Sequence, residues 1–194
     1  KQLNFGVFMD LVTEAVIFAS KAHDGMRRKL SSAPYIMHPL EAAVTVSSIT
    51  SDQEIIAASV LHDVVEDANI QPEEIEEKFG KRVRDLVMAE TENKRRHMRP
   101  EDSWKIRKEE GIEYLKQTKD TGAKILYLGD KLSNLKSIYR DIKVCGDEIW
   151  QKFNQKDPME HKWYYTEISN ALSEFKDTYA WKEYNELIKL IFDK

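Results

Sequence analysis

The stretch that decides the fold of this chain is Leu61-His62-Asp63-Val64-Val65-Glu66-Asp67. It places one imidazole and three carboxylates within six residues, inside an apolar run that starts at Ile55. On a helical wheel of about 100° per residue, the ionisable side chains share roughly 140° of arc and apolar side chains take most of the rest. Acidic neighbours at this spacing repel one another. A bound cation is therefore the first explanation for this face, and a solvated acidic face with an ordinary histidine is the alternative.

The composition around this stretch is typical of a helical globular protein. Charged residues make up 33% of the 194 residues and hydrophobic residues 41%, with only seven glycines and five prolines. Apolar residues recur at spacings of three and four, and no run of alternating β-branched residues is present. The sequence predicts an all-α fold, a single domain over residues 1–194 with about eight to ten helices.

Charge and cysteine content exclude several classes of protein. The net charge of −4 argues against a general affinity for nucleic acid. The single cysteine, Cys145, excludes an intramolecular disulfide and a thiolate metal site, in keeping with a reducing cytoplasm. No apolar run is long enough to span a membrane, and no signal peptide is visible in a sequence that starts at Lys1. We expect a cytoplasmic protein without membrane or nucleic-acid partners; the sequence indicates no oligomeric state.

Apolar spacing, capping residues and breakers divide the chain into helices. Ser51 and Glu54 together predict a capping box at the start of the helix that bears His62. Pro39 is expected at the first position of the preceding helix. Gly129 costs about 1 kcal/mol relative to alanine inside a helix, which predicts the close approach of a neighbouring element or ligand. The expected helices cover residues 5–23, 39–49, 51–68, 72–79, 81–89, 103–116, 123–142, 163–175 and 181–191, with a mobile loop at 90–103.

Two basic segments fall in the expected loops. One is Arg27, Arg28 and Lys29; the other comprises Lys94, Arg95, Arg96 and Arg99. Solvated loops commonly carry such charges, and so do loops that bind ligands. We predict that the first segment neutralises a phosphorylated substrate.

Four side chains form the candidate metal site: His38, His62, Asp63 and Asp130. They come from three separate helices or helix ends. Two imidazoles, two carboxylates and open water positions suit one octahedral divalent ion. Because no thiolate is available, Mn²⁺ or Fe²⁺ is favoured over Zn²⁺ and Mg²⁺.

Glu66 and Asp67 lie one helical turn beyond the His62-Asp63 pair. A divalent ion can activate a bound water as a nucleophile. The two carboxylates could orient that water or pass a proton to the leaving group. The sequence therefore predicts metal-assisted hydrolysis of a phosphoester.

At this point the sequence resembles a known family. His38, His62-Asp63 and Asp130 match the H…HD…D signature of the HD-domain phosphohydrolases. Further strings resemble the hydrolase domain of Rel/SpoT proteins and the stand-alone small alarmone hydrolases, over roughly residues 10–190. They are Ala22-His23-Asp24-Gly25-Met26-Arg27-Arg28-Lys29, Pro34-Tyr35-Ile36-Met37-His38-Pro39, Leu61-His62-Asp63-Val64-Val65-Glu66-Asp67, Phe79-Gly80, Gly129-Asp130-Lys131-Leu132-Ser133-Asn134-Leu135, and the late Trp150…Phe153 and Trp163-Tyr164-Tyr165.

The resemblance implies an all-α HD fold, one Mn²⁺ and a phosphorylated nucleotide substrate. It implies hydrolysis of the 3′-pyrophosphate of ppGpp-like nucleotides, which yields GDP or GTP and pyrophosphate. Matched residue by residue, it implies that the metal ligands are His38, His62, Asp63 and Asp130, and that the acid/base and water-positioning pair is Glu66 and Asp67. It also implies that Arg28 and Lys29 lie beside the base and that Asn134 and Tyr35 contact the ribose and phosphates. Lys131 would lie near a phosphate or brace the site.

Two departures from the family pattern leave the base open between guanine and adenine. Gly25-Met26 stands where the family usually has Gly-Gln, and Met-Ala-Glu-Thr-Glu-Asn-Lys follows Val87 in place of the Gly-Val-Thr-Lys of long Rel proteins. One alternative is a phosphohydrolase for another nucleotide, ppApp included, or for another phosphoester. A second is an inactive nucleotide-sensing module, against which the intact Glu66-Asp67 pair argues. With no synthetase segment in view, we expect degradation of the nucleotide rather than synthesis.

Overall fold

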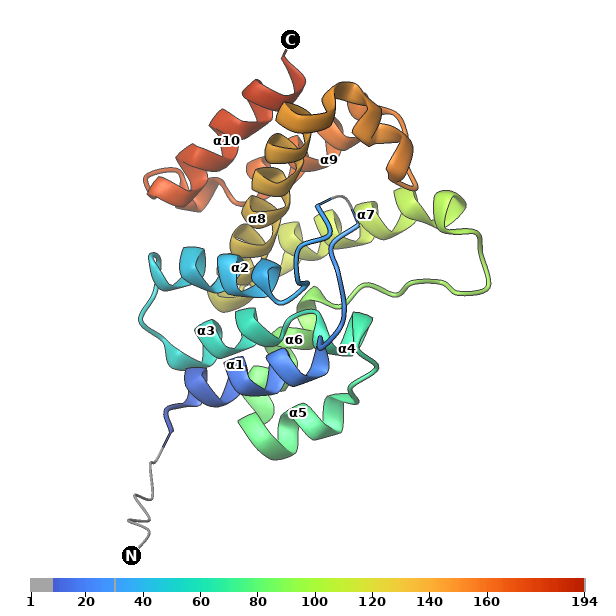
Figure 1. Cartoon of the computed structure of the whole chain (residues 1–194). Coiled ribbons are helices and arrows are strands. Elements are labelled where there is room, and N and C mark those ends of the chain that lie inside the picture. Colours follow the sequence, from blue (N-terminus) through green and yellow to red (C-terminus); the bar gives the residue numbers. More distant parts are fainter. Residues whose placement is uncertain (1–8, 30, 194) are drawn as a thin grey trace, which may run out of the picture.

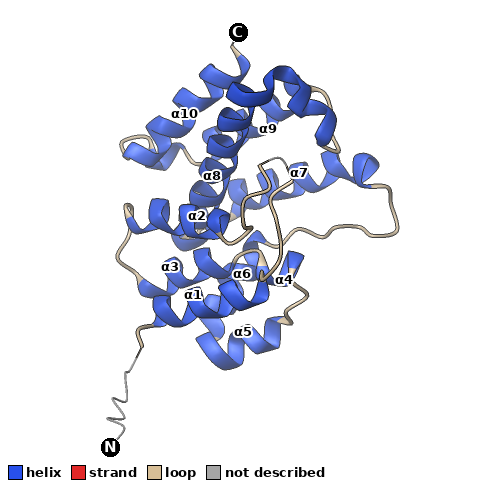
Figure 2. Ribbon diagram, in the orientation of Figure 1, coloured by secondary structure: helices blue, strands red, loops and turns tan. Residues whose placement is uncertain are grey.

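The computed structural model describes residues 9–29 and 31–193. Within these ranges the regular secondary-structure elements are all helices (Figure 2). The prediction of an all-α fold with eight to ten helices is confirmed. Within the same ranges, no helix combines the length and the apolar character that crossing a membrane requires. The helices are α1 (Leu11–Ala22), α2 (Met37–Ser47), α3 (Gln53–Leu61), α4 (Val64–Asp67), α5 (Pro72–Phe79), α6 (Lys81–Glu90), α7 (Pro100–Gln117), α8 (Thr121–Cys145), α9 (Pro158–Ala171) and α10 (Tyr179–Phe192), with the 3₁₀ helices η1 (Gly146–Lys152) and η2 (Ser173–Phe175).

Helix α8 is the longest helix and the axis of the molecule (Figure 1). Helices α2, α3 and α6 pack against its first half, and α10 packs along its second half, while α9 lies between α10 and α7. Leu126, Leu128, Leu132 and Leu135 are fully buried on several faces of α8. The first half of α8 is buried on nearly all sides, so the polar side chains of Asp130, Lys131 and Ser133 lie in the interior.

Several helix starts differ from the prediction. The N-cap of α3 is Asp52 rather than Ser51, because the Asp52 carboxylate accepts the Glu54 N–H at 3.0 Å. Helix α2 begins two residues before Pro39, which a first helical turn tolerates since its N–H groups have no partner within the helix. Helix α7 begins at Pro100 and α9 at Pro158, both earlier than expected and both with proline in the first turn.

The first helix begins at Leu11, with the Asp10 carboxylate accepting the Thr13 N–H at 2.9 Å. This N-cap shortens the predicted helix over residues 5–23, and residues 5–8 of that prediction lie outside the described residues. At the other end, Gly25 has a φ of +75°, which glycine adopts without strain. The chain turns there into the loop that carries Arg27, Arg28 and Lys29, here called the basic loop.

Gly129 allows α8 and α2 to approach closely, as predicted. A Cβ atom at this position would lie 2.6 Å from Cγ2 of Val46 and 3.0 Å from the carbonyl oxygen of Ala42. Both neighbours belong to α2, and the carbonyl cannot move aside without moving the backbone. The close crossing brings Asp130, the next residue on α8, beside His38 of α2.

We expect Gly129→Ala to lower the free energy of unfolding by about 1 to 3 kcal/mol, because overpacking outweighs the gain in helix propensity of about 1 kcal/mol. The measurement is urea-induced unfolding followed by circular dichroism. Gly111→Ala on α7 is the matched control, because the nearest atom to its Cβ is the hydroxyl of the Tyr127 side chain at 3.3 Å. Equal stability of the two variants would contradict the assignment of Gly129 to a close helix crossing.

Candidate metal centre

The His62-Asp63 pair lies at a break between two helices, which corrects the prediction of one continuous helix through this stretch. Helix α3 ends at Leu61 and α4 begins at Val64, so His62 caps one helix and Asp63 precedes the other. On a straight helix, successive side chains diverge by about 100°. The break allows both side chains to reach the same point beside α8.

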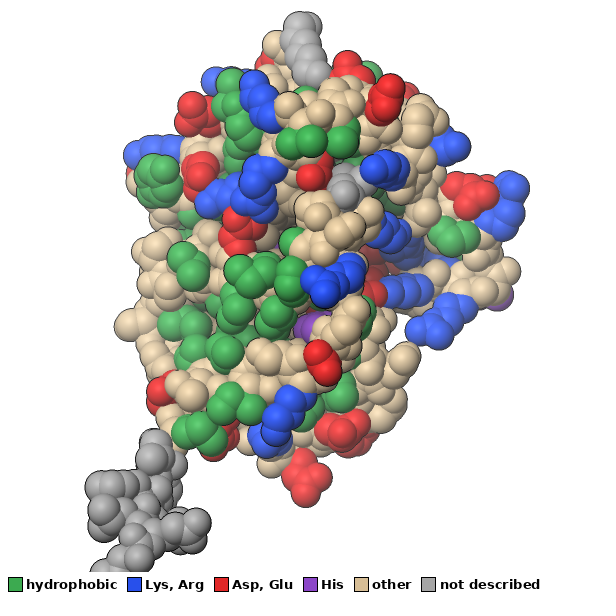
Figure 3. Space-filling model, in the orientation of Figure 1, with side chains coloured by type: hydrophobic (Ala, Val, Ile, Leu, Met, Phe, Trp, Pro, Cys, Tyr) green, Lys and Arg blue, Asp and Glu red, His purple; other side chains and the backbone are tan. Residues whose placement is uncertain are grey.

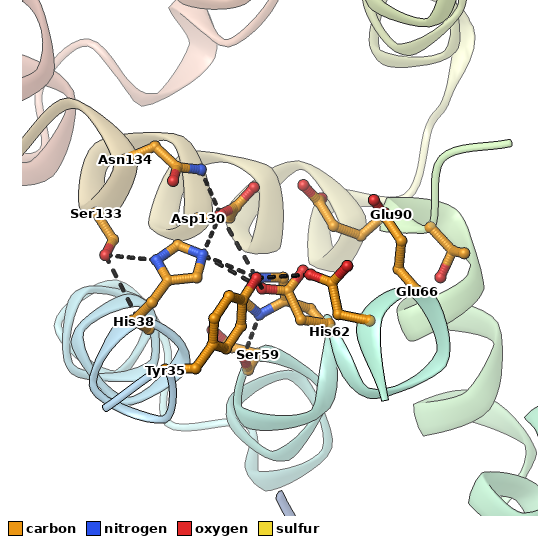
Figure 4. A network of polar contacts seen from close by, with 12 residues as sticks. Tyr35, His38, Ser59, His62, Glu66, Glu90, Asp130, Ser133 and Asn134 are labelled. Atoms are coloured by element: carbon orange, nitrogen blue, oxygen red, sulfur yellow. Dashed lines mark hydrogen bonds and ion pairs between the residues drawn. The ribbon is translucent and has the colours of Figure 1, made fainter. Parts of the chain in front are cut away.

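All four predicted ligands meet at this point, and Figure 4 labels three of them, His38, His62 and Asp130. The Nε2 atoms of His38 and His62 lie 3.3 Å apart. Oδ1 of Asp130 lies 2.9 Å from Nε2 of His38 and 3.5 Å from Nε2 of His62. Oδ2 of Asp63 lies 3.5 Å and 3.2 Å from the same two nitrogens. One ligand atom from each of His38, His62 and Asp130 falls within 4.8 Å of the others, a spacing suited to a shared ion.

The contacts around the cluster hold its side chains in place. Nδ1 of His62 lies 2.7 Å from the backbone oxygen of Ser59, which accepts only, so Nδ1 carries a hydrogen and donates it. The Asn134 amide donates to Oδ1 of Asp130 at 2.8 Å, which fixes that carboxylate on α8. Nitrogen lone pairs and carboxylates that converge in a buried site form the donor set that a divalent cation requires.

The electrostatics of the cluster favour positive charge at its centre. Burial opposes ionisation of Asp130, but the neighbouring Lys131 ammonium and the two imidazoles hold the pKa of its carboxyl well below the usual range. Burial likewise opposes protonation of His62, but Asp63 and Asp130 raise the pKa of its imidazole. A buried group of fixed negative charges stabilises a cation far more than it would in water.

Lys131 lies behind Asp130 rather than in the large cavity described below. Its ammonium contacts the Asp130 carboxylate and lies 2.6 Å from Oε1 of Glu90, a buried residue that was not predicted as part of the site. Burial disfavours the ammonium, but these carboxylates raise the pKa of Lys131 well above its usual value. The contact with Asp130 fits the predicted role of bracing the site.

Glu66 and Asp67, the predicted catalytic pair, lie beside the cluster with a different set of partners. The Tyr35 hydroxyl bridges Oδ2 of Asp63 at 2.8 Å and Oδ2 of Asp67 at 2.7 Å, and it donates to one of them at a time. Nζ of Lys94 lies 2.5 Å from Oδ1 of Asp67 and 3.6 Å from Oε1 of Glu66.

The Glu66 carboxyl is partly removed from water. Burial, together with the negative charges of Asp63 and Glu92, raises its pKa to about 7, although its Oε2 accepts the Glu92 backbone N–H at 3.1 Å. A carboxyl with this pKa is available as a proton donor near neutral pH.

A cavity of about 800 Å³ opens above Glu66 and Asp67. Figure 3 shows lysine and arginine side chains on several sides of a hollow with acidic side chains inside it. Of the predicted substrate residues, Tyr35 and Asn134 line the cavity together with the basic loop. Its basic lining residues are Arg27, Arg28, Lys29, Lys94, Arg96, Arg107 and Lys108, and Met98, Pro100, Ile138, Phe153 and Tyr165 line an apolar part.

A smaller cavity of about 170 Å³ is lined by three of the four clustered side chains, His38, Asp63 and Asp130, and shares seven lining residues with the large one. The shared residues are Arg28, Tyr35, Glu66, Asp67, Arg107, Lys108 and Asn134. Nη2 of Arg28 lies 3.1 Å from Oδ1 of Asn134 on α8, which holds the basic loop over this junction. A ligand in the large cavity would therefore extend to the metal centre.

The loop between α6 and α7 is held to the site at Glu92. This half-buried carboxylate lies 2.5 Å from Nη1 of Arg107 and 2.5 Å from Nζ of Lys108, both on α7. Sequence reasoning missed all three residues because nothing in the sequence showed which face of α7 turns toward the site.

The four basic residues of that loop separate into two pairs. Lys94 and Arg96 line the large cavity, whereas Arg95 pairs with Glu110 and Arg99 with Asp102 at the surface. Only the first pair is placed to meet a ligand there.

Comparison with known proteins places this geometry in a family. The family described as HD domain matches residues 15–160. The chain is 39% identical over 146 residues to the Xenopus tropicalis protein named guanosine-3′,5′-bis(diphosphate) 3′-pyrophosphohydrolase MESH1, covering 73% of this chain and 75% of that protein. A guanosine-3′,5′-bis(diphosphate) 3′-pyrophosphohydrolase of Aquifex aeolicus is 30% identical over 183 residues, which cover 92% of this chain but a quarter (25%) of the relative's length.

A solved structure from Listeria monocytogenes EGD-e shares the fold, with a TM-score of 0.70 and 31% identity over 81% of this chain and 99% of that one. The resemblance found in the sequence motifs is confirmed by these relatives. The family match runs from α1 into α9 and includes all four clustered side chains. This chain therefore belongs to the HD-domain family.

Proposed function

We propose that this protein hydrolyses the 3′-pyrophosphate of (p)ppGpp-like nucleotides and releases pyrophosphate with GDP or GTP. The observation that carries the proposal is the junction between the buried His/Asp cluster and a cavity lined by seven basic side chains. Such a concentration of positive charge suits a substrate with several phosphates. The names of the Xenopus and Aquifex relatives, both guanosine-bis(diphosphate) pyrophosphohydrolases, support the same reaction. We assign this activity to a single HD-type domain over residues 1–194.

We propose that His38, His62, Asp63 and Asp130 hold one divalent ion. Mn²⁺ is our first choice because the donor set contains imidazoles and carboxylates without a thiolate, and Fe²⁺, Zn²⁺ and Mg²⁺ are the alternatives to test. When bound, the ion supplies Lewis-acid polarisation and lowers the pKa of a bound water.

The protein's own side chains would then donate the proton, position the attacking water and bind the substrate. Water attacks the phosphorus attached to the ribose 3′ oxygen and loses one proton to the medium, the phosphorus–oxygen bond breaks, and the 3′ oxygen takes up a proton from the protein. We assign that proton to Glu66, whose pKa of about 7 suits donation, and the positioning of the attacking water to Asp67, held by Tyr35. Arg28 and Lys29 would lie beside the base.

Of the remaining residues predicted to bind the substrate, two would contact the nucleotide and one would hold a metal ligand in place. Asn134, which lines both cavities, would contact the ribose and phosphates. Arg27 would neutralise phosphate from the edge of the basic loop. Lys131 would hold Asp130 in place rather than touch the nucleotide.

This assignment predicts the pH dependence of the reaction. Below pH 7 the Glu66 carboxyl is mostly protonated and can donate, and above pH 7 it loses that proton. We therefore expect kcat/KM to fall as the pH rises through about 7, measured with the ion saturating at each pH. A rate that instead rises across the same interval would assign Glu66 the role of a base.

The test of the function is a substrate panel. The purified protein is incubated with ppGpp, pppGpp, ppApp and ordinary nucleotides, with Mn²⁺ or with EDTA, and released pyrophosphate is measured. We expect pyrophosphate from ppGpp and pppGpp only when the ion is present. Release from ppApp alone would assign adenine as the base. Turnover of ordinary nucleotides alone would contradict the proposal, and tight binding without turnover would favour a sensing module.

A further inference from the structure

His38 is the one proposed imidazole ligand whose outer nitrogen is held by a side chain. Its Nδ1 lies 2.9 Å from Oγ of Ser133, and that oxygen lies 2.7 Å from Oε2 of Glu41 (Figure 4 shows the serine beside the ring). Glu41 is anchored in turn by Arg140, whose Nη1 and Nη2 lie 2.8 Å and 3.2 Å from its two oxygens. His38 and Glu41 belong to α2, and Ser133 and Arg140 to α8, so the chain of contacts spans the close crossing of these helices.

The direction of these hydrogen bonds follows from the charge on Glu41. Burial favours its neutral form, but hydrogen bonds from Arg140 and Ser133 hold its pKa below the usual value. The carboxylate has no hydrogen to give, so the Ser133 hydroxyl donates to it. Ser133 has one hydrogen only and must therefore accept at its contact with His38. The donor at that contact is Nδ1–H of His38.

We propose that Ser133 and Glu41 position His38 by keeping a hydrogen on Nδ1, which leaves the Nε2 lone pair to face the ion. This inference rests on the metal centre of the proposed function. His62 has the same arrangement, but its partner is the backbone oxygen of Ser59. Side chains that hold the outer nitrogen of a ligating histidine fix its tautomer and orientation, and their loss typically weakens metal binding about 10- to 100-fold.

The first test is Mn²⁺ affinity, measured by competition with a chromogenic chelator. We expect Ser133→Ala to weaken binding about 10- to 100-fold. Glu41→Gln should weaken it less, because an amide oxygen still accepts from the serine, and Ser133→Thr should restore most of the affinity. Ser47→Ala is the matched control, since this exposed hydroxyl on α2 bonds only to the carbonyl of Val44 in its own helix.

The second test reads the tautomer directly and requires neither ion nor substrate. The chain has only five histidines, so ¹⁵N NMR of the ion-free protein can resolve His38. We expect a protonated Nδ1 in the wild type and a population with the hydrogen on Nε2 alone in Ser133→Ala. An unprotonated Nδ1 in the wild type would overturn the proposal, as would an affinity in Ser133→Ala within about threefold of wild type. A wild-type protein that binds no divalent ion would instead refute the proposed function, while the NMR result still decides the hydrogen-bond direction.

Discussion

Asp63→Asn is expected to abolish tight binding of a divalent ion and to reduce hydrolysis of ppGpp by about a thousandfold or more. The substitution removes one of two carboxylates whose oxygens lie within 3.5 Å of both Nε2 atoms of the cluster. Loss of the ion removes several kcal/mol of transition-state stabilisation, and each 1.36 kcal/mol is worth a factor of ten in rate. The measurements are isothermal titration with Mn²⁺ and the rate of pyrophosphate release.

The asparagine side chain keeps the size of Asp63 and an oxygen that accepts from the Tyr35 hydroxyl, so the fold should be preserved. Asp102→Asn provides the control, because among the described residues this exposed carboxylate on α7 forms an ion pair with Arg99 alone, three residues before it at the surface. Full activity of Asp63→Asn with bound Mn²⁺ would show that Asp63 is not a ligand.

Glu66→Gln is expected to retain the ion and to lower kcat about 10²- to 10⁴-fold, the range typical of a lost proton donor. No contact joins Glu66 to the two imidazoles or to Asp130 in the structure, and its described partners are the Glu92 backbone N–H and Lys94. The amide cannot donate a proton to the leaving oxygen, so the decline in rate above about pH 7 should also disappear.

The control for this variant is Glu73→Gln, an exposed carboxyl in the first turn of α5. Metal content after dialysis and kcat with saturating ppGpp distinguish a role of Glu66 as proton donor from a role as metal ligand. Unchanged kcat would exclude Glu66 as the proton donor, and loss of the ion together with kcat would make it a ligand instead.

The helices that follow from local apolar periodicity could be predicted from the sequence. The helices predicted over residues 72–79 and 123–142 appear in the structure as α5 and as part of the longer α8. Helix starts were less predictable, because neighbouring residues compete for a cap: Asp52, rather than Ser51, accepts the N–H groups of α3. The cost of Gly129 in a helix correctly indicated a close neighbour, and the structure identifies that neighbour as α2.

The candidate site was predictable where residue type alone implies chemistry. Two histidines and two aspartates far apart in the chain were expected to share one ion, and they lie together. Glu92, Arg107 and Lys108 were not predictable, because an ion pair between a loop and one face of α7 depends on how that helix is rotated. The break that turns both His62 and Asp63 toward α8 was missed as well, since the stretch itself contains no helix breaker.

By itself, the sequence determined that this protein is helical, and it predicted that the Leu61–Asp67 stretch carries two of the four metal ligands and the acid/base pair. Spacing and residue type suffice for those conclusions, because they depend on local geometry and on the chemistry of single side chains. Only the tertiary structure showed that Lys131 contacts Glu90 of α6 and that Ser133 contacts both His38 and Glu41 of α2. Those contacts join residues on α2, α6 and α8 that become neighbours only when the helices pack, and burial then gives each charge and hydrogen bond its direction.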